Sequence, residues 1–312
     1  MPTSKSPASR KPPSPPAPIQ PLKGVRVLSL ALNLPGPAAL MRCRQMGASC
    51  VKLEPPPPAG APAGASGDPM KLYNPTAYAA LHAGVRTAMA DLKTERGQQR
   101  LHRELAKTDV LLTSFRPSAL AKLGLSWKAL HKQYPQLSQV AIVGSPGERA
   151  EEPGHDLTYL AENDLVTGLD LPATLYADMG GSLMASEAVL QAVLHQRAKG
   201  KGVCLEVALS AAAGYLALPR SWGLTQPGAA VGGGHAGYRL YACKDGRVAV
   251  AALEPHFAAS LCAAAGVVAP NMKAMFAPAT HAGIEAWLKG KTRQELDTLA
   301  VEKDIPLHTL AS

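Results

Sequence analysis

Aromatic residues and paired cysteines are what this sequence most lacks. Only 4% of the 312 residues are aromatic, whereas 46% are hydrophobic, mostly Ala, Leu and Val. Such a mixture is typical of an α/β protein with closely packed helices, and the length suffices for one large domain or two ordinary ones. The five cysteines form no CxxC pair and no Cys/His zinc spacing, which indicates reduced thiols in a cytosolic protein without a metal site.

Long apolar runs are also absent. No run reaches the ~18 residues that a membrane span requires. The first residues lack the charged-then-apolar order of a secretory signal. We therefore expect a soluble, cytoplasmic protein with no membrane partner.

Signatures of phosphate loops and of nucleic-acid binding are weak or missing. The stretch ALNLPGPAAL (31–40) is not the GxGxxG of a dinucleotide site, and no Walker A string occurs. The net charge is +9, of which Lys5, Arg10 and Lys11 supply +3 within the first twenty residues. Three charges without interleaved aromatics are typical of a solvated linker, so we expect no nucleic-acid partner.

Alternating strand and helix patterns predict a parallel sheet. The first twenty residues are rich in Pro and Ser, with almost nothing to bury, and are expected to be a disordered tail. The next segments predict a strand, a helix and a second strand that is halted by prolines: GVRVLSLAL (24–32), LPGPAALMRCRQMGA (34–48) and SCVKLEPPPP (49–58). The pattern repeats over 86–115 and 120–144, and a long amphipathic helix from Gly180 to about His195 precedes the strand VCLEVAL.

The last third of the chain changes pattern. GLTQPGAAVGGGHAG (223–237) is a glycine-rich connection that we expect to be mobile. YRLYACKDGRVAVAAL (238–253) predicts a hairpin around Lys244-Asp245-Gly246, with Asp-Gly as the turn pair. The residues beyond it look helical.

Three titratable residues stand at element boundaries, and each has an ordinary structural interpretation. His155 in EEPGHDLTYLAEND (151–164) is placed to begin a helix. Asp178 in YADMGGSLMASEAVLQAVL is a good N-cap for the helix that follows. Glu254 in AALEPHF fits an ordinary acid at the end of a hairpin strand. Singly, none of the three requires a catalytic role.

Their surroundings change this interpretation. The chain resembles the family III CoA-transferases, which include α-methylacyl-CoA racemase, in blocks that follow the family order. The blocks are PLKGVRVLSLALNLPGPAALMRCRQMGASCVKLEPP, ADLKTERG, DVLLTSFRPSALAKLGL, GHDLTYLA, ADMGGSLMA, LYACKDGRVAVAALEPHF and TRQELDTLAVEKDIPL. The resemblance implies an α/β fold, with a Rossmann-like CoA-binding domain over 21–215 and a partial small α+β domain over 216–312.

The Gly-His-Asp triplet resembles the racemase branch of that family. The resemblance implies that His155 and Asp178 exchange a proton with opposite faces of the substrate α-carbon, and that Glu254 orients the imidazole. Inversion next to a thioester needs two such groups, one able to accept a proton and one able to donate it. The enolate oxygen needs donors as well, and the backbone N–H of Asp156 is our candidate.

The resemblance also implies contacts with coenzyme A, carried as part of the substrate rather than as a covalent cofactor. Lys93 and Arg116 are the natural phosphate partners. The full set of implied contacts is Asn33, Ala90, Leu92, Lys93, Arg116 and Tyr159. The expected partners are an acyl-CoA and either a second copy of the chain or a related subunit.

The chain departs from the family in ways that leave alternatives open. LEPPPPAG stands where an arginine is usual, the basic cluster before ADLK is reduced to Arg86, and the loop before Gly-His-Asp lacks its aromatic. The spacing from His155 to Asp178 is also short, and the end after DIPL suggests a C-terminally shortened member. One alternative is CoA transfer with Asp178 as nucleophile. Another is a non-catalytic paralogue that acts as a partner subunit or scaffold.

Overall fold

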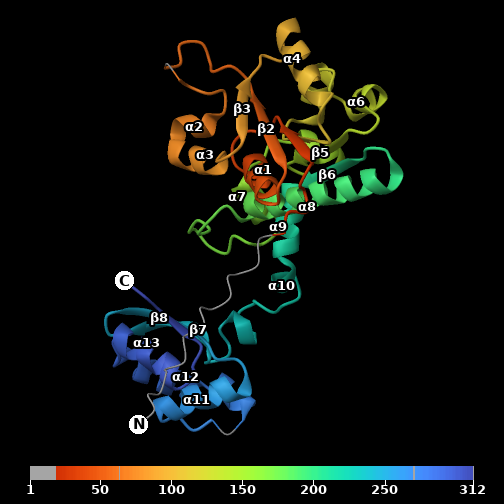
Figure 1. Ribbon diagram of the computed structural model, residues 1–312. Helices are drawn as coiled ribbons and strands as arrows, with labels where there is room; N and C mark the ends of the chain where they lie inside the picture. The colour runs from red at the N-terminus through yellow and green to blue at the C-terminus, as the bar shows by residue number, and fades with distance from the viewer. Residues whose placement is uncertain (1–18, 63, 270, 312) are drawn as a thin grey trace, which may run out of the picture. The chain divides into compact units, whose positions relative to one another are not determined.

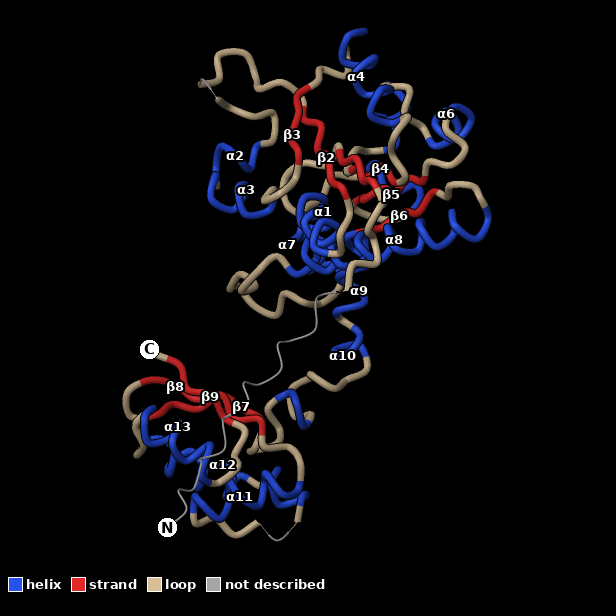
Figure 2. Tube along the Cα trace, in the orientation of Figure 1, coloured by secondary structure: helices blue, strands red, loops and turns tan. Residues whose placement is uncertain are grey.

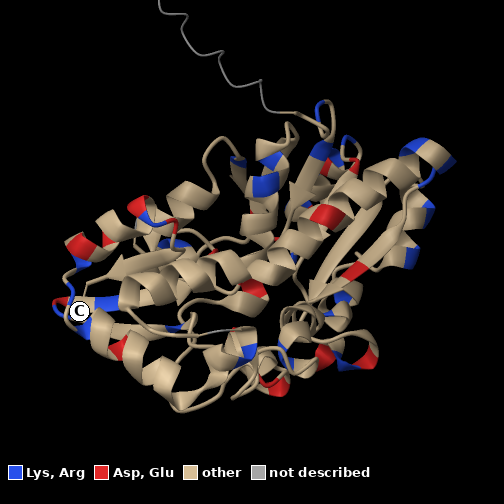
Figure 3. Ribbon diagram, turned by 90° about the horizontal axis from the view of Figure 1, so that it is seen from below, with Lys and Arg blue, Asp and Glu red and all other residues tan. Residues whose placement is uncertain are grey.

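The computed structural model describes residues 19–62, 64–269 and 271–311, and the chain divides into two compact units, Met1–Leu216 and Ala217–Ser312 (Figure 1). Each unit is considered by itself. The predicted tail lies outside the described residues, except for the exposed Ile19 and Gln20. Acidic and basic residues are interspersed over both units (Figure 3).

A parallel six-stranded sheet forms the centre of the first unit, in the order β3-β2-β1-β4-β5-β6. This confirms the predicted α/β fold. The strands are β1 (Arg26–Ser29), β2 (Ser49–Glu54), β3 (Arg86–Met89), β4 (Val110–Thr113), β5 (Ser138–Val143) and β6 (Cys204–Ala208). The order reverses beside β1, which neighbours both β2 and β4, and such a switch point opens a crevice at the carboxyl ends of the strands.

Helices cover both faces of this sheet (Figure 2) because neighbouring strand residues face opposite sides and both sides are apolar. Val27 packs into a core with α1 and α8, whereas the adjacent Leu28 packs into a second core with α4 and α6. The helices are α1 (Pro35–Gln45), α2 (Pro69–Tyr73), α3 (Pro75–Leu81), α4 (Glu95–Leu105), α5 (Pro117–Lys122), α6 (Trp127–Gln133), η1 (Gly147–Glu151), α7 (Asp156–Glu162), α8 (Tyr176–Lys199) and α9 (Leu209–Leu216).

Three details differ from the sequence prediction. The single helix predicted after residue 120 is two short helices, α5 and α6. The long helix α8 begins at Tyr176, before the predicted Gly180. The short helices α2 and α3 were not anticipated, although Asp68-Pro69 and Asn74-Pro75 each place a capping side chain directly before a proline, which is a helix-start signal.

The second unit contains a three-stranded antiparallel sheet in the order β7-β8-β9. The predicted hairpin is present, but its two-residue turn is Lys244-Asp245, and Gly246 already belongs to β8. A Cβ at Gly246 would lie 2.3 Å from the carbonyl oxygen of Leu310, so the close approach of β9 requires glycine there. The elements are α10 (Leu218–Ser221), η2 (Ala230–Gly232), β7 (Tyr238–Cys243), β8 (Gly246–Ala251), α11 (Pro255–Ala265), η3 (Met272–Phe276), α12 (Pro278–Lys289), α13 (Arg293–Glu302) and β9 (Leu307–Leu310).

The strand β9 corrects the expectation that everything beyond the hairpin is helical. Its four residues pair with β8, so its conformation depends on a partner sixty residues earlier in the sequence. None of the helices in the described part of the chain combines the length and the apolar composition that a membrane span requires.

Candidate active site

A cavity of about 750 Å³ lies at the switch point of the six-stranded sheet. Its walls come from the loops that follow β1, β4 and β5, where Asn33, Arg116 and Gly144 line it. Further lining comes from the first residues of α7 and from Asp178 of α8. Parallel sheets with this order bind ligands at this edge, and the cavity is large enough for a small organic group.

His155 lies where α7 begins, as predicted from its position before DLTYLAE, and it lines this cavity. Its backbone is extended (φ −144°, ψ 169°), which places it outside the helix as the N-cap residue. The Thr158 hydroxyl accepts from the His155 N–H at 3.1 Å and donates to its carbonyl oxygen at 2.7 Å. The residue's side chain is exposed, so a substrate or solvent can reach it.

Asp178 lies in the first turn of α8 and also lines the cavity. The N-cap interpretation is wrong: the helix begins at Tyr176 and its N-cap is Leu175, so Asp178 is the third helical residue. A carboxylate in the first turn interacts favourably with the helix dipole, and this half-buried side chain remains open to the cavity.

Asp156 joins the two helices through its side chain, a role that the sequence did not indicate. The carboxylate is buried, and its Oδ1 accepts from the backbone N–H of Asp178 at 2.9 Å. Asp156 therefore caps a first-turn amide of α8 while its own amide lies in the first turn of α7. First-turn amides have no acceptor within their own helix, so the Asp156 N–H can serve the oxyanion role predicted for it.

The pKa of Asp178 is raised from its ordinary value of 3.8 to about 6. The main cause is burial, which disfavours the charged form, and the neighbouring Asp156 carboxylate adds to it. His155 acts in the opposite direction and lowers this pKa. A carboxyl group that titrates near neutral pH can act as a proton donor or as a proton acceptor.

The buried Tyr159 side chain packs against Gly154 and Gly144. A Cβ at Gly154 would lie 2.6 Å from the Tyr159 hydroxyl oxygen, and one at Gly144 would lie 2.3 Å from it. Burial raises the pKa of Tyr159, and the nearby charge of Asp178 raises it further. The glycine of the Gly-His-Asp triplet is thus required by packing, because the ring fills the space that a side chain would need.

This packing gives a first prediction. Gly154→Ala is expected to cost about 1–3 kcal/mol of unfolding free energy, since the buried ring cannot move aside without strain. Urea denaturation followed by circular dichroism measures the loss. The matched control is Gly168→Ala, where an added Cβ meets nothing within 4 Å. Equal stability of the two variants would contradict this account of Tyr159.

The structure divides the residues expected to contact coenzyme A into two groups. Asn33, Arg116 and Tyr159 line the cavity. Ala90, Leu92 and Lys93 follow the edge strand β3 and are not among its lining residues; Ala90 is buried in the sheet core and Lys93 is exposed. Contacts of all six residues with coenzyme A stay predictions.

Glu254 belongs to the second unit, where it is the exposed N-cap residue of α11. Its position after β8 agrees with the expectation of an acid at the end of the hairpin. Its partnership with His155 stays a prediction.

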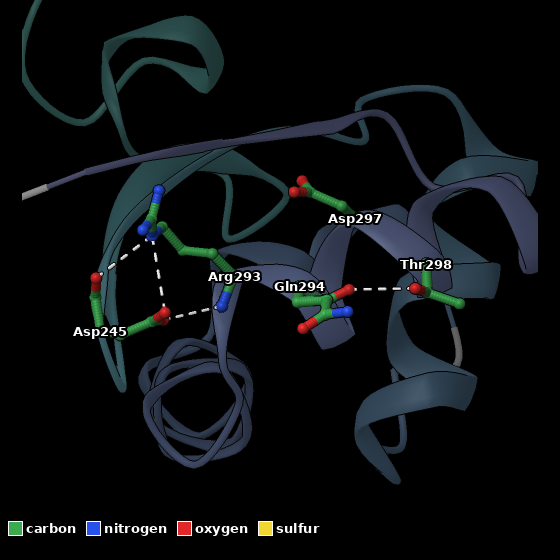
Figure 4. Close-up of a pocket in the computed structure, with 5 residues that line it drawn as sticks. All are labelled: Asp245, Arg293, Gln294, Asp297 and Thr298. Atoms are coloured by element: carbon green, nitrogen blue, oxygen red, sulfur yellow. Dashed lines mark hydrogen bonds and ion pairs between the residues drawn. The ribbon is translucent and has the colours of Figure 1, made fainter.

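A second cavity, of about 530 Å³, lies in the second unit between the β7-β8 turn and α13 (Figure 4). Its walls carry Asp245, Arg293, Gln294, Asp297 and Thr298. The Arg293 backbone N–H donates to Asp245 Oδ1 at 2.7 Å and its side-chain Nε to the Asp245 carbonyl at 3.2 Å. These bonds hold the turn against the helix, which is a structural use of both residues.

The first cavity therefore has the parts of an acid/base site beside a ligand crevice. A family model described as CoA-transferase family III matches residues 22–312. The chain belongs to CoA-transferase family III. This confirms the resemblance seen in the motif blocks, among them GHDLTYLA and ADMGGSLMA.

Curated relatives of the chain are named for different reactions. The chain is 35% identical over 151 residues to cinnamoyl-CoA:phenyllactate CoA-transferase of Clostridium sporogenes, covering 46% of this chain and 36% of the relative. It is 28% identical over 254 residues to human alpha-methylacyl-CoA racemase, covering 76% of this chain and 62% of the relative. The matches thus span less than two thirds of these relatives' length.

The fold is that of a solved structure described as a hypothetical protein, Rv3272, from Mycobacterium tuberculosis. The TM-score is 0.79 at 24% identity, covering 95% of this chain and 86% of that one. This likeness establishes the fold only. The reaction of this family III chain must be inferred from the residues of its cavity.

Proposed function

We propose that the chain inverts the α-carbon of a 2-methyl-branched acyl-CoA by two-base proton transfer. The observation that supports it is that His155 and Asp178 line one cavity from the starts of two helices, which the Asp156 side chain joins. A neutral imidazole and a carboxyl group that titrates near neutral pH form a donor and acceptor pair.

In one direction, the neutral His155 ring accepts the α-proton while protonated Asp178 donates a proton to the other face. The product then leaves a protonated imidazole and an ionised carboxylate, which is the state that the reverse reaction requires. Before the next turnover in the same direction, the imidazole must release its proton to solvent and the carboxylate must take one up, so no net acid or base is consumed. Glu254 is proposed to orient the imidazole.

The enolate formed between the two transfers carries its charge on the thioester oxygen. We assign the Asp156 N–H as its donor because the amides at the start of α7 carry the partial positive charge of the helix dipole. The Asp156 Oδ1 accepts a hydrogen bond from the backbone N–H of Asp178 in α8. This bond fixes the position of the Asp156 N–H relative to the Asp178 residue. Arg116 is proposed as a phosphate partner of the coenzyme A moiety.

Proton exchange tests the proposal directly. Incubation of each enantiomer of 2-methylbutanoyl-CoA in deuterated water, followed by NMR, is expected to show loss of the α-hydrogen signal, and His155→Ala is expected to abolish this loss for the enantiomer that His155 deprotonates. Circular dichroism confirms that the variant is folded. A folded native protein that binds the ester without exchanging its α-hydrogen would refute the racemase proposal.

CoA transfer is the second candidate, because a transferase is among the relatives with 35% identity. In that reaction Asp178 attacks the thioester carbonyl, the coenzyme A thiolate leaves, and a mixed anhydride remains on the carboxyl group. Hydroxylamine would trap this acyl-enzyme as a hydroxamate. Trapping that persists in His155→Ala favours transfer, whereas exchange that requires His155 favours racemisation.

The raised pKa of Asp178 gives a prediction for the pH profile. For the enantiomer that Asp178 deprotonates, kcat/KM is expected to rise as the pH increases through about 6, because the base must be ionised. Asp156→Asn keeps an oxygen to accept from the Asp178 N–H but removes the charge that raises this pKa, so the rise should move to lower pH. If the rise of kcat/KM stayed at the same pH in Asp156→Asn, it would reflect the ionisation of a residue other than Asp178.

A further inference from the structure

A buried charged network lies beside the cavity in the first unit. Lys52 is completely buried in β2, although lysine is almost never fully buried without a partner. Its ammonium group contacts the carboxylate of Asp68, Glu54 Oε1 at 3.1 Å and His82 Nε2 at 2.9 Å. Three acceptors therefore meet the three hydrogens of the ammonium group, so its hydrogen bonding is complete.

The network fixes its own protonation states. An ammonium group can only donate, so His82 Nε2 must accept, and Nδ1 must carry the proton that it donates to the Tyr78 carbonyl at 2.6 Å. Burial lowers the pKa of His82, and the charge of Lys52 lowers it further, in agreement with a neutral ring. Two carboxylates and an imidazole within 4.8 Å of one another are also metal donors, but here the Lys52 ammonium lies against all three.

Asp68 connects this network to the cavity wall through hydrogen bonds. Its Oδ2 contacts Lys52, while its Oδ1 accepts from the backbone N–H of Asn33 at 3.2 Å and of Met70 at 2.9 Å. Asn33 and Met70 both line the cavity. Asn33 is in the left-handed region (φ 61°), which costs free energy for most residues, and the bond from its N–H to Asp68 helps to hold it there. Asp68 is itself completely buried.

The same carboxylate begins α2, whose Met70 packs with α1 and α3 (orange in Figure 1). We propose that Lys52 and Asp68 are positioning residues of the coenzyme A ester site: they hold the Asn33 turn and the start of α2 in the geometry that binds the ester. The inference depends on the proposed function only because it identifies the ligand of this cavity as a coenzyme A ester.

Asp68→Asn separates this role from general stability. A carboxylate has two acceptor oxygens, whereas a carboxamide has one. The amide oxygen must face the Lys52 charge, so the NH₂ group faces the N–H groups of Asn33 and Met70, and both lose their acceptor. The matched control is Glu104→Gln in α4, which loses ion pairs with Arg26 and Arg86 in the same unit but does not line the cavity.

Two measurements decide the proposal. In the ligand-free protein, Asp68→Asn is expected to speed hydrogen–deuterium exchange of the peptides that contain Asn33 and Met70, and Glu104→Gln is not. In calorimetry with coenzyme A and 2-methylbutanoyl-CoA, Asp68→Asn is expected to raise Kd by roughly 10-fold to 100-fold, with exchange at saturating ester nearly unchanged. Glu104→Gln should bind as the native protein does.

The outcomes are distinguishable. A native protein that binds neither probe overturns the proposed function, and the ligand role of Asp68 with it. A native protein that binds, with an Asp68→Asn variant of unchanged Kd, overturns only the positioning proposal. Should Asp68→Asn not fold, Ser66→Ala replaces it, because the Ser66 hydroxyl accepts from the Asp68 N–H at 3.0 Å. That variant is expected to raise Kd about threefold or more, and an unchanged Kd would overturn the proposal.

Discussion

Replacing Asp178 by asparagine is expected to reduce α-proton exchange by about 10²-fold to 10⁴-fold for the 2-methylbutanoyl-CoA enantiomer that Asp178 deprotonates, the usual contribution of a positioned acid or base. Asparagine has nearly the same volume and keeps its place in the first turn of α8, but its carboxamide cannot exchange a proton. The substitution therefore removes the proton-transfer group but keeps the shape of the cavity wall. NMR in deuterated water measures the rate, and calorimetry measures binding of the ester.

The control for this variant is Glu187→Gln. Glu187 is an exposed carboxylate on the same helix and is not among the residues that line the cavity. Its removal should leave exchange within about a factor of two, as surface substitutions away from special features usually have small effects. If Asp178→Asn kept more than a tenth of the native rate, Asp178 would not be one of the two bases.

The two candidate reactions make different demands on the pair. A transferase needs Asp178 as nucleophile and does not need a second base on the opposite face. Racemisation needs both residues, so His155→Ala and Asp178→Asn should each abolish inversion of the α-carbon, and their combination should add little to this loss because they act as one unit. A chain that showed neither reaction while folding and binding a related subunit would support the scaffold alternative instead.

The sequence predicted the sheet because its strands carry their own signals. SCVKLE (49–54) is halted by a run of prolines, and the helix after His155 begins at the residue that follows it, as the Gly-His-Asp pattern indicated. The strand β9 could not be found in this way. Its four residues, LHTL, have no alternation strong enough to distinguish them, and they become a strand because β8 offers a free edge.

The sequence identified the residues of the candidate site but not the hydrogen bonds and ion pairs that connect them to their neighbours. His155 and Asp178 were identifiable from motif blocks, and the structure brings both to one cavity. The link through Asp156 was not, because a carboxylate that accepts from an amide 22 residues later leaves no periodic trace. The burial of Lys52 was equally hidden: its partners Asp68 and His82 lie 16 and 30 residues away, and a lysine in a strand ordinarily faces solvent.

Lys52→Met is expected to lower the free energy of unfolding by about 3–5 kcal/mol, because the loss of one partner leaves buried charge without compensation. Burial opposes ionisation of Glu54, but hydrogen bonds from Ser66 and Tyr78 and the charge of Lys52 outweigh it, so the pKa of Glu54 is lowered in the native protein. In the variant the charge of Lys52 is gone and burial of the carboxylate remains. Urea denaturation at neutral pH measures the difference.

Two comparisons separate this effect from the loss of a methylene chain or of an ordinary ion pair. Arg86→Met removes an exposed cation from the neighbouring strand, where it contacts Glu104 at 2.8 Å, and should cost about 1 kcal/mol or less. Lys52→Met with Asp68→Asn removes opposite charges together and should be more stable than Lys52→Met alone, because one uncompensated carboxylate disappears. The stability difference between the native protein and Lys52→Met should also shrink as the pH falls and Glu54 binds a proton, because the charge of Lys52 stabilises only the ionised carboxylate. A double variant no more stable than the single one would show that the ammonium group acts by filling space rather than by balancing charge.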